Sequence, residues 1–122
     1  MTIVVQRVYS AAADTDGYRV LLDRLWPRGL KKTDVAYDLW AKDLAPSNEL
    51  RKWFGHDPAL WDEFQRRYAA ELDQHVEHWQ PLAERSRKET VVLLFGARDE
   101  THNNAVALKA YLERWLRTHH AR

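Results

Sequence analysis

Two arginines and a tryptophan lie close together in the motif Arg-Leu-Trp-Pro-Arg-Gly at residues 24–29, the first loop. The guanidinium group is a planar fork that can bind a phosphate or a carboxylate through two parallel hydrogen bonds. The proline restricts its own backbone and that of the preceding residue, and the glycine permits a sharp turn. An apolar run with the character of a strand comes directly before the motif. We therefore predict that Arg24, Trp26 and Arg28 are ligand-binding residues held by a scaffold.

A second polar stretch, residues 96–104, follows the continuous apolar run at residues 90–95 and leads into a helical pattern. The free backbone N–H groups and the dipole at the start of a helix favour an anion. Arg98, His102 and Asn103 add side-chain hydrogen-bond donors to this second loop. We predict that both loops contribute to one pocket for a small anionic ligand that carries phosphate or carboxylate.

The same residues have structural interpretations that the sequence leaves open. Asp99 or Thr101 can simply cap the following helix. The arginines of the first loop can form salt bridges with Asp23, Asp43 or Asp99, because buried arginines are seldom left unpaired. Trp26 can belong to the core, since aromatic side chains contribute much of the buried area of small domains.

Catalysis and metal binding depend on few candidates. If the protein is an enzyme, which the sequence leaves undecided, we expect Asp99 or His102 to be the acid or base, because they combine a titratable group with the loop position. The six histidines are scattered; His75 and His78 are three residues apart, but no HExxH spacing occurs. A metal site built from Asp99 and His102 is a weaker alternative, and we predict no metal site. No nucleotide fingerprint is present, and the cofactor, if there is one, stays unknown.

The elements that would position the two loops alternate along the chain. We predict strands at residues 3–9, 18–23, 35–42 and 90–95. We predict helices at residues 48–54, from Pro58 to a break between His75 and Pro81, at residues 82–88, and from about His102 onwards. This order indicates one α/β domain over residues 1–122, with a small, mainly parallel sheet between helical layers. Such folds carry their sites at the carboxyl ends of the strands.

Composition excludes several classes of protein. The 122 residues are 45% hydrophobic, which is enough for one core without disulfides, and there is no cysteine. A formal charge of +1 does not mark the chain as a nucleic-acid or membrane-surface protein. No apolar run approaches the roughly 20 residues that span a bilayer. We expect a cytoplasmic protein without membrane contact, either a monomer or a small homo-oligomer.

The sequence also resembles a known family, the YeaO-like proteins, which are short bacterial proteins with a domain of unknown function. The resemblance rests on the motif at residues 24–29 with the preceding residues 16–21, on residues 43–54, and on the strand–loop–helix segment that includes Gly96, Arg98 and Asp99. It covers nearly the whole chain and implies a bacterial α/β domain. Longer relatives carry a cysteine near the second loop, whereas this chain has Phe95 there and cannot use thiol chemistry.

Two functions therefore remain in view. The first is a binding or catalytic pocket for a small anion between the two loops. The second is a non-catalytic module that binds nucleic acid or a protein through its arginines and its basic tail, residues 117–122. A strongly salt-dependent affinity for long polyanions would distinguish the second function from the first.

Overall fold

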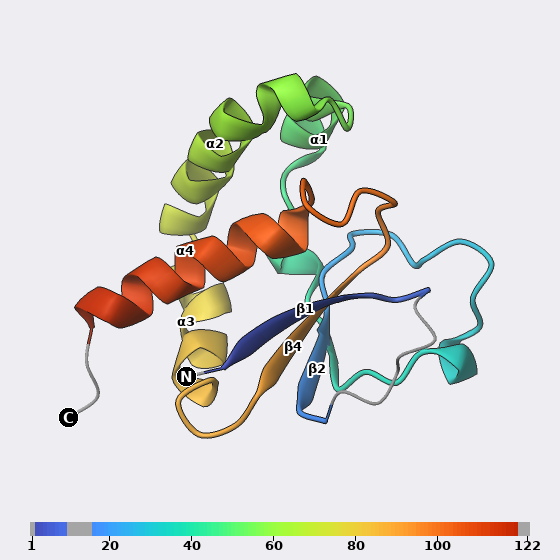
Figure 1. Cartoon of the computed structure of the whole chain (residues 1–122), viewed down its shortest axis with the longest axis vertical. Coiled ribbons are helices and arrows are strands. Elements are labelled where there is room, and N and C mark those ends of the chain that lie inside the picture. The colour runs from blue at the N-terminus through green and yellow to red at the C-terminus, as the bar shows by residue number, and fades with distance from the viewer. Residues whose placement is uncertain (1, 10–15, 120–122) are drawn as a thin grey trace.

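The computed structural model describes residues 2–9 and 16–119, which form a parallel four-stranded sheet packed against α-helices (Figure 1). The strands are β1 (Ile3–Arg7), β2 (Tyr18–Leu21), β3 (Leu39–Trp40) and β4 (Val91–Phe95), in the spatial order β1-β4-β2-β3. The α-helices are α1 (Asn48–Phe54), α2 (Trp61–Asp73), α3 (Val76–Arg85) and α4 (Asn104–Thr118). Three 3-10 helices connect them: η1 (Lys32–Asp34), η2 (Lys42–Leu44) and η3 (Pro58–Leu60). The predicted α/β fold with a parallel sheet is confirmed.

The two faces of the sheet are covered by different kinds of structure. All residues of β4 are buried, as expected of a central parallel strand with both faces covered. Leu93 and Phe95 belong to the large core shared with the α-helices, whereas Val92 and Leu94 belong to a smaller cluster on the other face. That smaller cluster is covered by the connection between β2 and β3, which carries only the short η1 (Figure 1). The first loop is part of this connection.

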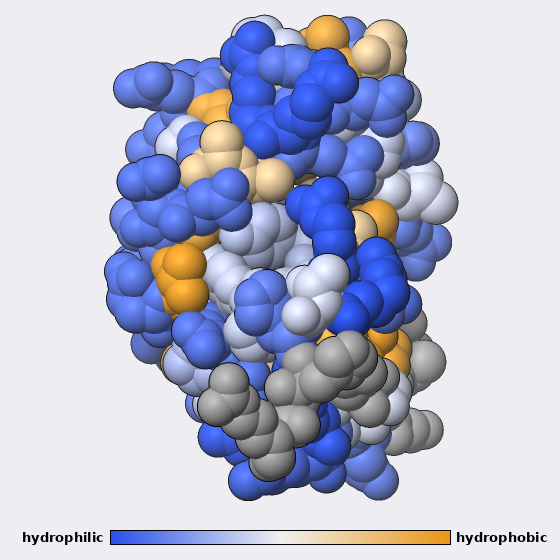
Figure 2. Space-filling view, turned by 90° about the vertical axis from the view of Figure 1, so that its left-hand side faces the viewer, coloured by the Kyte–Doolittle hydropathy of each residue, from blue (hydrophilic) through white to orange (hydrophobic). Residues whose placement is uncertain are grey.

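The helical side supplies most of the core. Phe64, Tyr68 and Leu72 recur along one face of α2 and are buried, as the helical spacing predicts. The Tyr68 hydroxyl donates a hydrogen bond to the carbonyl of Leu44, which satisfies the polar end of this buried side chain. The outer face of the molecule on the side of the C-terminus is mostly hydrophilic, with separate hydrophobic residues (Figure 2). Within the described residues, each helix is too short or too polar to cross a membrane.

Local signals determine α1 as predicted. The Ser47 hydroxyl accepts a hydrogen bond from the N–H of Leu50 at 3.1 Å and so caps the first turn. Gly55 ends the helix in the left-handed conformation with φ of 54°. Glu71 of α2 fixes this cap, because its carboxylate accepts from both the backbone N–H and the hydroxyl of Ser47, at 2.9 and 2.6 Å. Helix α1 is thereby attached to α2 and placed beside the first loop.

Several predicted elements differ from the structure. The strand expected at residues 35–42 is reduced to Leu39–Trp40, because Trp40 packs beside the same smaller cluster as Val35 and the alternation of faces is lost. The break expected before Pro81 falls at residues 74–75, and Pro81 lies exposed inside α3. The neighbouring buried residues of α3 hold the helix together although the proline cannot donate a hydrogen bond. Of the basic tail, residues 117–118 belong to α4, and residues 120–122 lie outside the described part of the chain.

Candidate functional site

A pocket of about 610 Å³ lies where β2 and β4 end. Parallel strands bring their carboxyl ends to one edge, and the N–H of Leu22 donates to the carbonyl of Leu94 at 3.1 Å just at this edge. The pocket is lined by the first loop, by α1 and by parts of the second loop, over the side chains of Phe54 and Phe64. The prediction that the two loops lie together at the carboxyl ends of neighbouring strands is confirmed.

Asp23 is the acidic group of this pocket. Burial raises the pKa of its carboxyl to about 6, although hydrogen bonds from the N–H of Gly96 and the side chain of Asn104 and the positive charge of Arg51 act in the opposite direction. A Cβ added at residue 96 would lie 2.5 Å from Oδ2 of Asp23, so only glycine allows this close approach. The carboxyl can thus take up or release a proton near neutral pH.

Arg24 is a cation without a full set of partners. Its Nε is buried and has no hydrogen-bond partner in the described part of the chain. Its Nη2 makes one long contact with the carbonyl of Pro46, at 3.4 Å. A buried polar group of this kind is normally satisfied, by the protein, by water or by a ligand. Arg24 is one of the residues that line the pocket.

Three further cations surround the pocket, namely Arg28 of the first loop and Arg51 and Lys52 of α1. All three are exposed, and the salt bridges among residues 2–9 and 16–119 involve neither them nor Arg24. The salt bridges considered for Arg24 and Arg28 are therefore not formed with described residues. The hydroxyl of Tyr9 donates to the carbonyl of Arg28 at 2.7 Å and braces the loop from the end of β1.

Trp26 packs against the smaller core cluster and also lines the pocket. Its indole N–H donates to the carbonyl of Leu30 at 2.6 Å, which closes the first loop on itself. Its ring stands edge-on to Tyr37 and Trp40, with centroids 5.6 and 5.3 Å apart. The indole N–H of Trp40 in turn donates to the carbonyl of Asp23 at 2.7 Å. Aromatic packing therefore fixes the backbone from which the arginines extend.

His102 lines the pocket, and Asp99 holds it in place. Oδ2 of Asp99 lies 2.9 Å from Nδ1 of His102, and Oδ1 accepts from the N–H groups of Thr101 and His102, each at 2.9 Å. These hydrogen bonds keep the pKa of Asp99 well below its usual range, and the two from backbone N–H groups have the largest effect. The His102 ring also stands edge-on to Trp61 at 5.3 Å between centroids. Asp99 itself is not among the residues that line the pocket.

The other two predicted residues of the second loop, Asn103 and Arg98, lie in different surroundings. Asn103 is buried and caps α4, since its Oδ1 accepts from the N–H of Val106 at 3.0 Å and its Nδ2 donates to the carbonyl of Asp99 at 2.9 Å. It lines the pocket with its polar atoms already bonded. Arg98 is exposed and lies outside the pocket lining.

The pocket residues that the sequence did not identify include Asp23, Arg51, Lys52, His56 and Asn104. From the sequence, Asp23 was considered only as a possible salt-bridge partner of the arginines in the first loop. Its place directly after an apolar strand, at the edge where sites form, was the available signal. The three residues from α1 and the turn after it carry no such signal, because only the docking of α1 on α2 brings them here.

Comparison with known proteins gives a family without a described activity. The family model DUF488-N3i, described as the inactive DUF488-N3 subclade, matches residues 2–122. The chain is 46% identical over 112 residues to the uncharacterised protein YeaO of Escherichia coli, covering 92% of this chain and 97% of that protein. It is 52% identical over 68 residues to the uncharacterised protein Rv3073c of Mycobacterium tuberculosis, covering 56% of this chain and 58% of that protein. No solved structure matches. The resemblance to YeaO-like proteins is thereby confirmed.

Proposed function

The chain belongs to the DUF488-N3i family, and from this premise and the geometry of the pocket we propose that the protein binds a small anion bearing phosphate or carboxylate. The observation that carries the proposal is the buried Nε of Arg24, which lacks a partner among the described residues and belongs to a side chain that lines the pocket. A phosphate or carboxylate oxygen supplies the acceptor that this N–H needs, and a second oxygen can bind the same guanidinium.

The charge of the pocket supports the same ligand class. The residues that line the pocket include four cations, Arg24, Arg28, Arg51 and Lys52, and one carboxyl, that of Asp23. The pKa of Asp23 is raised to about 6, so its negative charge is already partly neutralised in slightly acidic solution. An anion bound near these cations offsets their mutual repulsion, whereas a neutral or cationic ligand does not.

Binding without turnover agrees with the description of the subclade as inactive and with the absence of cysteine. If the pocket does catalyse a reaction, two groups are suited to move a proton: the Asp23 carboxyl, because of its raised pKa, and the imidazole of His102. Asp99 then acts through His102, since its hydrogen bond to Nδ1 orients the ring.

Thermal melts in a buffer without phosphate test the proposal. Inorganic phosphate should raise the melting temperature of the wild-type protein, because a ligand at about 100 times its Kd adds about 2.7 kcal/mol to the free energy of unfolding. Arg24→Gln should lose most of this shift. Arg66→Gln is the matched control, because it removes the same charge from an exposed side chain of α2 that pairs with Glu63.

An equal loss of the shift in both variants, or no shift in the wild-type protein, would contradict a specific pocket. A titration with a long single-stranded oligonucleotide covers the alternative. Tight binding that weakens steeply with salt would favour a nucleic-acid module instead.

A further inference from the structure

Three side chains of metal-ligating types lie outside the pocket, at the junction between α2 and α3. His75 precedes α3, and Glu77 and His78 lie in its first turn. Backbone hydrogen bonds of 2.9 Å hold the junction, from the N–H of His75 to the carbonyl of Leu72 and from the N–H of His78 to the carbonyl of His75. The adjacent Trp79 is buried, and its indole N–H donates to the same Leu72 carbonyl at 2.8 Å. The backbone that carries the three side chains is therefore fixed by packing.

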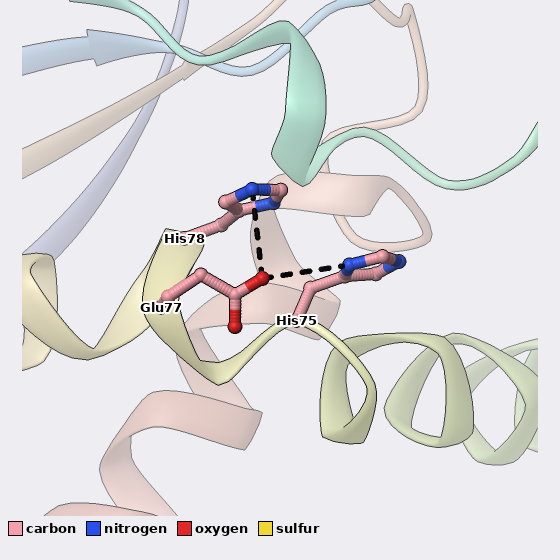
Figure 3. A group of neighbouring side chains, drawn as sticks. All are labelled: His75, Glu77 and His78. Carbon is pink, nitrogen blue, oxygen red and sulfur yellow. Dashed lines mark ion pairs between the residues drawn. The ribbon is translucent and has the colours of Figure 1, made fainter.

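The carboxylate of Glu77 lies next to both imidazoles (Figure 3). Its Oε1 is 3.9 Å from Nδ1 of His75 and 3.7 Å from Nε2 of His78, and the three donor atoms lie within 4.8 Å of one another. These separations exceed the roughly 2.7–3.2 Å of a hydrogen bond. Tetrahedral coordination with ligand distances of about 2.0–2.1 Å separates its donor atoms by about 3.3 Å. All three side chains are exposed, so they can reorient, with one ring turning out of the parallel arrangement, to bring the donor atoms to this separation.

The two imidazole rings add a second geometric feature. Their planes are within 3° of parallel, with centroids 5.2 Å apart, and one nitrogen of each ring lies less than 4 Å from the same carboxylate oxygen. Within residues 2–9 and 16–119, no other three His, Cys, Asp or Glu side chains gather in this way. The spacing of the ligands in the sequence, at residues 75, 77 and 78, is not one of the common zinc motifs, which is why the sequence predicted no metal site.

We propose that His75, Glu77 and His78 bind a late first-row divalent cation, with Zn²⁺ as the representative. Two imidazoles and one carboxylate suit Zn²⁺, Ni²⁺ and Cu²⁺, whereas Mg²⁺ and Ca²⁺ prefer sites made of oxygen atoms alone. Three protein ligands leave at least one coordination position for water, and the exposure of all three side chains gives water access to it. The cation would exchange with solvent and would tie His75, which precedes α3, to the first turn of that helix without being needed for folding.

Calorimetric titration of Zn²⁺ into protein purified without an affinity tag tests this site. The wild-type protein should bind one equivalent. His75→Ala and His78→Ala should each weaken binding by at least about tenfold, because each removes one of three ligands. Glu77→Gln keeps the shape of the side chain, removes its charge and should also weaken binding. Circular dichroism of each variant confirms that it is folded.

His119→Ala is the matched control, because His119 is an exposed histidine on another part of the chain and should leave zinc binding unchanged. Mg²⁺ should give no heat of binding. An absence of zinc binding, or a zinc affinity unaffected by His75→Ala and His78→Ala, would show that these side chains form an ion pair only. Loss of the binding in His119→Ala would place the metal near the C-terminus and overturn the assignment.

Discussion

The first loop and the second loop occupy equivalent places in the fold but use their polar side chains differently. Each follows a strand of the same parallel sheet and opens onto the same pocket. The second loop satisfies its own groups: Asp99 bonds to Thr101 and His102, and Asn103 caps α4. The first loop is held by aromatic packing and leaves the guanidinium of Arg24 incompletely bonded.

If the proposed function is correct, this difference places hydrogen-bonded side chains on one side of the pocket and ligand-binding side chains on the other. Donors that already have partners inside the protein contribute little to a ligand, because binding would have to break those bonds first. Donors on a loop fixed by apolar contacts stay available. We therefore expect substitutions of the hydrogen-bonded residues of the second loop to reduce stability, and substitutions of the arginines of the first loop to reduce anion affinity.

The largest expected effect concerns Asp23, which lies where the two loops meet. Its pKa is raised to about 6 in the folded protein, so the folded state holds a proton that the unfolded chain has already released. Stability should therefore fall as the pH rises from about 4 to about 6 and then level off. A shift of about two pKa units corresponds to roughly 3 kcal/mol. Urea melts of the wild-type protein and Asp23→Asn measure this, because the variant lacks the titrating group.

The same proton should affect the pocket. Sulfate is a suitable probe, since its charge is constant over this pH range, and its affinity should increase below pH 6 in the wild-type protein but not in Asp23→Asn. Parallel stability curves for the two proteins between pH 4 and pH 7 would mean that Asp23 is better solvated than its surroundings indicate.

A smaller effect is expected in the second loop. Asn103→Ala removes the cap of α4 and leaves the N–H of Val106 and the carbonyl of Asp99 without these bonds. The free energy of unfolding should fall by about 1–2 kcal/mol. Arg98→Ala, an exposed change in the same loop, should stay within about 0.5 kcal/mol. Similar losses in both variants would remove the contrast between capping and exposed residues of this loop.

The smallest change in stability is expected in the first loop. Arg28 is exposed, so Arg28→Lys should alter the free energy of unfolding by no more than about 0.5 kcal/mol. Phosphate affinity should nevertheless fall, because lysine keeps the charge but lacks the planar fork. Thermal melts with and without phosphate report both quantities. A loss of about 3–5 kcal/mol in Arg28→Ala would instead indicate that Arg28 satisfies a buried charge.

Local sequence signals predicted the elements that depend on local interactions. Ser47 and Gly55 bound α1 as their capping roles require, and the apolar run at Val91–Phe95 forms the central strand. The predicted bounds of strands and helices were less accurate where tertiary contacts determine them. Trp40 turns toward the cluster beneath the first loop, and α3 continues through Pro81, because packing outweighs the local preference in both places.

For the pocket, the sequence predicted that both loops contribute, but not that their side chains are hydrogen-bonded differently. Arg24, Trp26, Arg28, His102 and Asn103 all line the predicted pocket. The sequence could not show that Asn103 uses its polar atoms as a cap, nor that α1 adds cations from outside the two loops. Those facts depend on which hydrogen bonds and which helix packing the folded chain selects.

The position of β4 has a consequence for the nascent chain. This strand lies between β1 and β2, yet it is made after both of them and after α1, α2 and α3. Neither β1 nor β2 can form its ladder with β4 until residue 95 has left the ribosome, and such distant pairings form slowly. Until then, the apolar residues of β1 and β2 lack their partner strand and stay exposed. A chaperone that covers exposed apolar surface would therefore be most useful during this interval. The pocket itself comes into being with that last insertion.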